Sequence, residues 1–233
     1  MARLQCLGSS SSGNCFILDV DGEKLIIDLG VKWSEILSGL DYDITKVCGC
    51  LVTHVHSDHS KSIPNATYYC LDVFSCQGVK DKYDSVEVLA PMRVSTIGSF
   101  KVVPLPLTHN VENYGYMVFH EKLGRLVYAV DCVEFPYNLK DVAHWLIEAN
   151  HDEEIIFDNL LESDYSRSAS ENHLNILQVV DALSRNKCLS MKNIVLCHLS
   201  DSNSNAEKFK RTIEEEIGIE NVYIASKGQV VEL

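Results

Sequence analysis

Short runs of apolar residues, separated by Gly, Asp, Asn or Pro, recur through most of the chain. Each run is about four to eight residues long and is rich in Val, Ile, Leu and Tyr, a composition typical of β-strands. We therefore predict strands at residues 3–7, 15–20, 24–28, 47–53, 67–70, 101–107, 114–121, 125–130, 193–197, 222–225 and 229–233.

Helical periodicity is confined to residues 33–40, 139–148, 169–183 and 206–217. In the third segment Leu174, Leu177, Val180 and Leu183 recur at spacings of three and four, which places them on one face of a helix. Strands in both halves, with helices late in each half, favour two packed sheets covered by helices. Because no linker, repeat or charge block divides the chain, we expect one domain over residues 1–233.

Three histidines and one aspartate crowd the sequence from Thr53 to His59, directly after an apolar run. At a strand end, side chains two residues apart point the same way, so His54 and His56 can converge on one ion. Asp58 and His59 follow in the next turn and can reach a second point nearby. Imidazole and carboxylate groups are ligands of zinc and similar ions. The alternative, solvated histidines beside a capping Asp58, would be preferred for a single histidine but not for this cluster.

Four further polar residues end apolar runs, and each carries a metal-binding or hydrogen-bonding side chain. They are Asp28, His109, Asp131 and His198. A polar residue at a strand end is commonplace, but a rigid sheet often positions catalytic residues in this way. As a set with the histidine cluster, they predict one shared site.

The motif His-x-His-x-Asp-His, with a later His, Asp and His at strand ends, resembles the metallo-β-lactamase fold in its two-metal hydrolase form. Residues 8–15 (GSSSSGNC), 148–152 (EANHD) and 197–200 (CHLS) further resemble YycJ/WalJ-type proteins. That subgroup consists of exonucleases acting on DNA 5′ ends, related to ribonucleases Z and J and to small phosphodiesterases. The resemblance covers nearly the whole chain and implies a four-layer αββα sandwich of class α+β, with two mixed β-sheets flanked by helices.

The resemblance also implies a role for each candidate residue. One metal would be held by His54, His56 and His109, the other by Asp58, His59 and His198, and Asp131 would bridge them. Asp28 would orient a ligand histidine from behind the site. The metals would be zinc or manganese, with iron also possible. The subgroup's Gly-His-Leu-Ser element is matched by residues 172–175, where His173 is kept but the flanking Gly and Ser are not.

Two metals about 3.5–4 Å apart can share a hydroxide and stabilise charge on a phosphoryl oxygen, which suits hydrolysis of a phosphodiester. Asp58 would also orient the nucleophile, and His173 or His151 could protonate the leaving group as general acid. The leading hypothesis is therefore a DNA 5′-exonuclease. A small (cyclic) phosphodiesterase and a thioester or lactone hydrolase of the same fold are the alternatives. A scaffold that has lost catalysis is disfavoured by the complete ligand set.

Composition sets the expected compartment. Nine cysteines form no regular pattern, and the first residues lack the apolar core of a secretory signal, so we expect a reduced, cytoplasmic chain. Cys48 and Cys50 lie inside an apolar run that favours a buried strand over a metal site. No stretch approaches the roughly 18 apolar residues of a membrane span, so we expect no membrane partner.

The charge balance argues against tight binding of DNA. Lys and Arg number 20 and Asp and Glu 33, a formal net charge of −13 that repels nucleic acid. Two divalent ions would add four charges, −13 + 4 = −9, and make the site locally positive. We therefore expect contact with DNA to be local and to depend on the bound metals. A small phosphodiester remains the alternative substrate. The sequence does not decide the oligomeric state. Scattered phosphate-binding candidates are the serine loop of residues 8–14 and Lys80, Lys82, Arg167, Lys208, Lys210 and Arg211.

Overall fold

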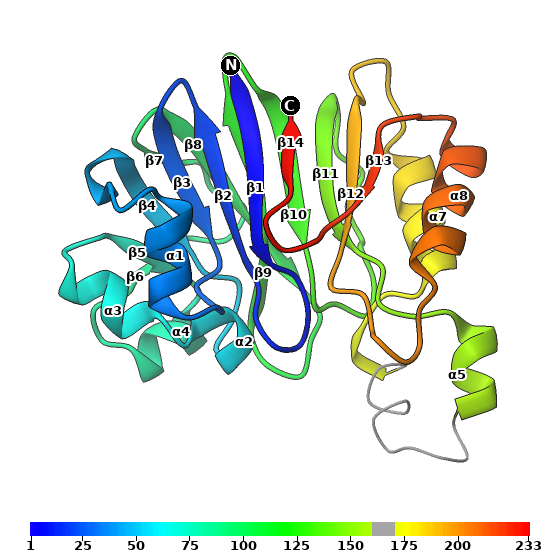
Figure 1. The fold of residues 1–233 in the computed structure, drawn as a ribbon, viewed down its shortest axis with the longest axis horizontal. Coiled ribbons are helices and arrows are strands. Elements are labelled where there is room, and N and C mark those ends of the chain that lie inside the picture. Colours follow the sequence, from blue (N-terminus) through cyan, green and yellow to red (C-terminus); the bar gives the residue numbers. More distant parts are fainter. Residues whose placement is uncertain (160–170) are drawn as a thin grey trace.

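The computed structural model describes residues 1–159 and 171–233. Within these residues, two seven-stranded sheets lie face to face, and helices cover their outer sides (Figure 1). This confirms the predicted sandwich of two mixed sheets flanked by helices. Arg167 and residues 169–170 of one predicted helix lie outside the described residues.

The first sheet combines an antiparallel half with a parallel half. Strands β14, β1, β2 and β3 pair antiparallel, and β3, β4, β5 and β6 pair parallel. In sheet order, the strands are β14 (Val230–Glu232), β1 (Ala2–Gly8), β2 (Cys15–Val20), β3 (Glu23–Ile27), β4 (Val47–Leu51), β5 (Val73–Ser75) and β6 (Glu87–Val88).

The second sheet has the same mixed character. Strands β7 to β10 pair antiparallel, and β10 to β13 pair parallel. In sheet order, the strands are β13 (Val222–Ile224), β12 (Asn193–Cys197), β11 (Val142–Glu148), β10 (Gly124–Ala129), β9 (Asn113–His120), β8 (Phe100–Leu107) and β7 (Ser95–Ile97).

The helices divide between the two outer faces. Beside the first sheet lie α1 (Trp33–Gly39), α3 (Ile63–Tyr68) and α4 (Gln77–Lys82); beside the second lie α7 (Ile176–Arg185) and α8 (Ala206–Ile217) (Figure 1). The short α2 (Ser57–Ser60) and α5 (Glu153–Asn159) follow strand ends, and a 3-10 turn spans Ile44–Lys46. In the described parts of the chain, no helix has the length and hydropathy to cross a bilayer.

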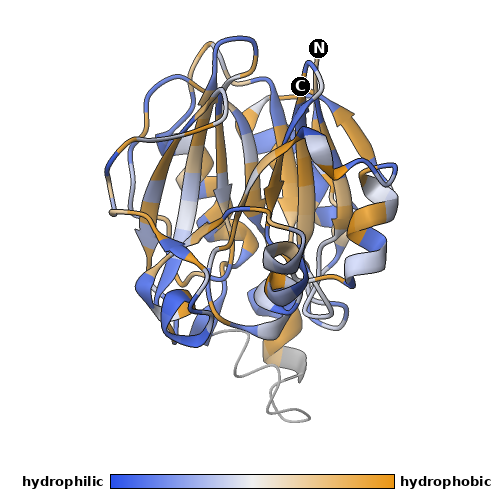
Figure 2. Cartoon of the chain, turned by 90° about the vertical axis from the view of Figure 1, so that its left-hand side faces the viewer, coloured by the Kyte–Doolittle hydropathy of each residue, from blue (hydrophilic) through white to orange (hydrophobic). Residues whose placement is uncertain are grey.

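Strand alternation divides the core into two layers. In β10, Leu126 and Tyr128 join the cluster between the sheets, where the Tyr128 ring meets that of Phe16 on β2 edge to face. Val127 and Ala129 point the other way, into the cluster under α7 and α8. Because both faces of this sheet are covered, its central strands β11 and β12 are buried along their whole length. Figure 2 shows hydrophobic residues concentrated in the strands and hydrophilic residues in the surrounding loops.

The prediction of a helix at residues 139–148 is wrong. The structure has β11 there, with all seven of its residues buried. A strand covered on both faces reads as a continuous apolar run, and such a run does not distinguish a buried strand from a buried helix. His144, placed on that helix by the sequence, instead lies in the sheet and hydrogen-bonds Leu123 and Asn193.

Two further predicted elements also differ. The strand predicted at residues 67–70 is the end of α3, which begins with Ile63-Pro64 and packs Ile63 and Ala66 into the core. The helix predicted at 169–183 is interrupted: residues 171–172 are helical, residues 173–175 are not, and α7 begins at Ile176, where Asn175 caps it by accepting a hydrogen bond from the Gln178 amide. This late start leaves His173 on an irregular segment before the helix.

The cap of α7 can be tested against the cap of α8. Asn175→Ala and Asn205→Ala each remove a side chain that accepts from the backbone at the third helical residue, so each should lower the free energy of unfolding by about 1 kcal/mol. Urea denaturation measures this loss. Only Asn175→Ala should also reduce the hydrolase activity expected from the sequence, because Asn175 follows His173 by two residues. Equal activity of the two variants would contradict a link between this cap and the site.

Candidate metal centre

The candidate residues meet where the strands of both sheets end. Asp28 follows β3, the histidine cluster follows β4, and His109, Asp131 and His198 follow β8, β10 and β12. Three of them adopt left-handed backbone conformations, with φ of 61° at Asp28, 52° at Asp131 and 53° at His198. Such a conformation costs about 1–2 kcal/mol for a residue other than glycine. The surrounding structure holds this strain where it turns three polar side chains to one point.

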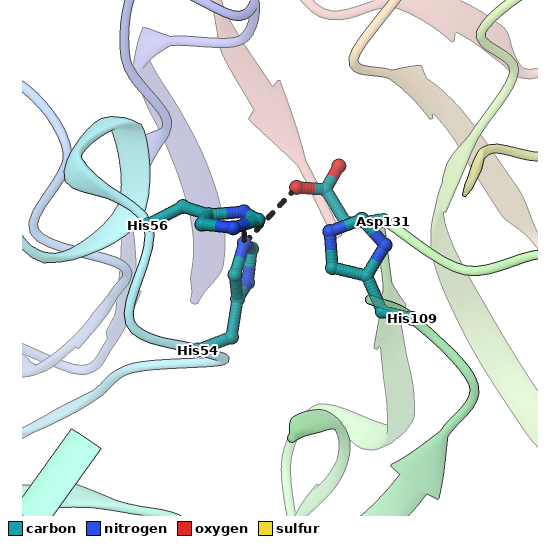
Figure 3. Close-up of side chains that lie close together, drawn as sticks. All are labelled: His54, His56, His109 and Asp131. Atoms are coloured by element: carbon teal, nitrogen blue, oxygen red, sulfur yellow. Dashed lines mark hydrogen bonds and ion pairs between the residues drawn. The ribbon is translucent and has the colours of Figure 1, made fainter. Parts of the chain in front are cut away.

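The first donor group contains His54, His56, His109 and Asp131, whose ligand atoms all lie within 4.8 Å of one another. His54 Nε2 lies 3.0 Å from His56 Nδ1 and 3.3 Å from Asp131 Oδ2. The three imidazoles and the carboxylate face one another across a small space (Figure 3). Imidazoles and one carboxylate around one point are typical of a zinc or manganese site.

The second donor group contains Asp58, His59, Asp131 and His198. His59 Nε2 lies 3.1 Å from Asp131 Oδ2 and 3.3 Å from Asp58 Oδ2, and His198 Nε2 lies 3.8 Å from Asp58 Oδ2. The structure thus brings together all seven residues predicted to bind metal. Asp131 belongs to both groups, as its predicted bridging position requires.

The donor atoms fit a pair of cations. Both ring nitrogens of His109 and Nε2 of His198 are buried without a hydrogen-bond partner. A buried polar atom without a partner costs about 1–3 kcal/mol, so such atoms concentrated at one point indicate a missing ligand. Divalent ions held by these residues would satisfy Nε2 of His198 and one ring nitrogen of His109.

Two buried carboxylates hold ligand histidines from behind. Asp28 Oδ2 lies 2.7 Å from His59 Nδ1 and accepts a hydrogen bond from the Tyr128 hydroxyl, while its Oδ1 accepts from the Thr53 amide. These contacts direct His59 Nε2 toward the centre, as predicted for Asp28. On the other side, Glu148 Oε1 lies 3.0 Å from His198 Nδ1.

Glu148 is the residue that the sequence analysis did not assign to the site. It is fully buried at the end of β11 and also lies 2.6 Å from His173 Nδ1. With Asp131, His173 and His198 it forms a third donor group. Like the other site residues, Glu148 ends an apolar run. Because the sequence pattern of that run predicts a helix, its end does not mark Glu148 as a residue at a strand end.

The carboxylates set the charge of the histidines around them. Burial lowers the pKa of His54, and the neighbouring His59 lowers it further. Burial also lowers the pKa of His173, but Glu148 and Asp131 outweigh it and raise this pKa to about 11. Burial lowers the pKa of His198 as well, but Asp131, Asp58 and Glu148 outweigh it and raise this pKa to about 9. Both pKa values are raised because the neighbouring carboxylates favour the charged imidazolium.

The other candidate residues lie close to the centre without joining a donor group. Asn150 donates to the His198 carbonyl, and the serine loop reaches the site through Asn14, whose side chain lies 3.0 Å from His59 Nε2. His151 is buried, and its Nδ1 has no hydrogen-bond partner. Gly30 packs so closely against the Asp58 carbonyl that a Cβ would overlap it.

Comparisons with known proteins bear on this site. A family model described as anti-Pycsar protein Apyc1 matches residues 5–71. Exodeoxyribonuclease YycJ of Bacillus anthracis is 25% identical over an alignment of 234 residues. The alignment covers 90% of this chain and 86% of YycJ. The metallo-β-lactamase fold protein YhfI from Bacillus subtilis superposes with a TM-score of 0.80 at 15% identity, covering 100% and 99% of the two chains.

The chain has the metallo-β-lactamase fold and is similar to exodeoxyribonucleases of the YycJ/WalJ type. A diphosphatase from the PhnP family shares this fold, with a TM-score of 0.72 at 17% identity and coverage of 100% and 98%. Together with the clustered His and Asp donors, these relatives support a metal-dependent hydrolase.

Metal content tests the shared position of Asp131. When loaded with zinc or manganese, the protein should bind about two ions per chain, as two-metal hydrolases do. His109→Ala should lose one ion, whereas Asp131→Asn should weaken both sites. Mass spectrometry of the dialysed proteins measures the content, and His120→Ala, which changes a histidine outside the three donor groups, is the control. Wild-type content in Asp131→Asn would refute the bridge.

Proposed function

We propose that this protein hydrolyses phosphodiester bonds and acts as a DNA 5′-exonuclease. The observation that carries the proposal is the pair of adjacent donor groups sharing Asp131. Two cations held by these adjacent groups would suit a phosphoryl group, which develops charge on several oxygens at once. The similarity to exodeoxyribonuclease YycJ over most of both chains supports DNA as the substrate.

The protein's own residues would prepare the reaction. Bound divalent ions supply Lewis-acid stabilisation and an activated water nucleophile. Asp58, one fifth exposed at its side chain, would orient that nucleophile by accepting its hydrogen bond. Asp28 and Glu148 would hold His59 and His198 in fixed orientations through their Nδ1 atoms.

His173 is proposed as the general acid. Its Nδ1 is held by Glu148 and its side chain is 18% exposed, so Nε2 is left to reach a leaving group. His151 was the other candidate, but only 2% of this residue is exposed. A proton donor must come within hydrogen-bond reach of the leaving oxygen, and exposure favours His173 for this role.

A small phosphodiester is the second candidate substrate. The net charge of −13 favours it, because an acidic surface repels a polyanion more than a single phosphodiester. The fold likeness to a diphosphatase from the PhnP family is compatible with a small phosphorylated substrate.

Three substrates offered to the metal-loaded protein test the proposed reaction. We expect turnover of bis(p-nitrophenyl) phosphate and stepwise release of nucleotides from the 5′ end of an end-labelled oligodeoxynucleotide, because the paired cation sites suit phosphodiesters. A thioester should stay intact. Thioester turnover without phosphodiester turnover would refute the proposal, and cleavage of bis(p-nitrophenyl) phosphate alone would favour the small substrate. The metal-stripped protein is the control.

The leaving group tests His173. A deoxynucleoside alkoxide needs a proton, whereas p-nitrophenolate leaves readily without one. His173→Asn should therefore reduce kcat on DNA by about 100-fold or more, with a much smaller loss on bis(p-nitrophenyl) phosphate. His151→Asn is the matched variant. If His151→Asn instead shows the selective loss on DNA, the assignment moves to His151.

A further inference from the structure

A second cavity opens next to the metal centre, between the serine loop, the start of α1 and the residues after α2. Its volume is about 430 Å³, within the range of small-molecule sites. We name it the serine–lysine pocket after the residues that line it, which include Ser9, Ser10, Ser12, Lys32, Lys61 and Lys227. The loop between β1 and β2 supplies the serines of this lining, and in Figure 1 it runs close to α2.

The pocket and the metal centre share structural elements. Ser9 Oγ in the pocket wall accepts a hydrogen bond of 2.9 Å from the His198 amide. Lys61 follows His59 by two residues, and its ammonium donates to the Ser12 carbonyl over 3.0 Å. At the base of the loop, the Asn14 amide donates to the Asp58 carbonyl over 2.7 Å. The wall of the pocket is therefore hydrogen-bonded directly to segments that carry the two donor groups.

The charge of the pocket is opposite to that of the whole protein. Three lysines and one carboxylate, Glu35, line it, which leaves an excess of two positive charges in a chain of net charge −13. Lys227 is paired with Glu35, whereas Lys32 is exposed and Lys61 contacts only a neutral carbonyl. Serine hydroxyls beside unpaired ammonium groups favour phosphate oxygens.

The alternatives elsewhere are less suited to an anion. The larger cavity of about 740 Å³ is lined by Glu134, Glu153 and Asp181 against one arginine. Of the lysines proposed from the sequence, Lys80, Lys208 and Lys210 are each paired with carboxylates. The serine–lysine pocket therefore combines positive charge, hydroxyl groups and closeness to the metal centre.

We propose that the serine–lysine pocket binds the backbone phosphate next to the one that is cleaved on a nucleic-acid strand. The proposal rests on the phosphodiesterase function proposed above and adds a second anchoring point to it. Anchoring a neighbouring phosphate sets the register of the strand in the centre. It also supplies the local attraction that the acidic surface lacks.

The ratio of two activities tests the pocket. Bis(p-nitrophenyl) phosphate carries no neighbouring phosphate, so we compare its kcat/KM with that of a single-stranded oligodeoxynucleotide. Lys32→Ala and Lys61→Gln should each lower the oligonucleotide-to-small-substrate ratio about tenfold, because each removes a charge-assisted contact. Glutamine keeps a donor for the Ser12 carbonyl, so the loop stays in place in Lys61→Gln.

Two further measurements address charge directly. The slope of log affinity for the oligonucleotide against log salt concentration should become shallower by about 0.7 for each lysine lost. Glu35→Gln frees Lys227 and should raise the activity ratio about two- to threefold, since the pocket loses its only carboxylate. Lys187→Ala, which removes an exposed lysine near Gly218, is the matched control and should change neither quantity.

The outcomes separate the two proposals. If the wild-type protein degrades the oligonucleotide and both lysine variants keep its activity ratio, the pocket proposal is refuted and the exonuclease function stands. If the wild-type protein cleaves bis(p-nitrophenyl) phosphate but leaves the oligonucleotide intact, nucleic acid as the substrate is refuted, and the pocket proposal with it.

Discussion

The carboxylate of Asp131 is the group on which the site depends. Its oxygens lie 3.3 Å from His54 Nε2, 3.1 Å from His59 Nε2 and 3.0 Å from His198 Nδ1. A buried carboxylate is costly unless charges or hydrogen bonds compensate it, and here the compensation comes from histidines carried by both sheets. The left-handed backbone at Asp131 turns its side chain into that position. One residue thus ties the two halves of the sandwich together at the centre.

The histidines depend in turn on carboxylates behind them. Asp28 holds His59, and Glu148 holds both His198 and His173. Each outer carboxylate sits at a strand end and is fully buried, so packing of the sheets sets the direction of the imidazole rings. The same strands that form the hydrophobic core therefore orient the donor atoms, and changes in core packing should be felt in the site.

The acidic surface and the basic pocket have complementary consequences. A net charge of −13 weakens general attraction to nucleic acid, so affinity has to come from the centre and its immediate surroundings. The serine loop connects the two, since it contacts His59 and His198 on one side and Lys61 on the other. In the proposed function, the substrate would be recognised beside the point where it is cleaved.

The sequence by itself determined the sandwich, ten of its strands and the seven candidate donors, because strand alternation and a polar residue at a strand end are local patterns. It did not assign Glu148, since a strand buried on both faces has no alternation that separates it from a helix. It also did not identify the serine–lysine pocket, whose Lys32, Lys61 and Lys227 are far apart in the chain and are ordinary surface lysines in isolation. Only the tertiary structure decided which side chains share one space, because the pairing of strands and the packing of two sheets bring distant residues together.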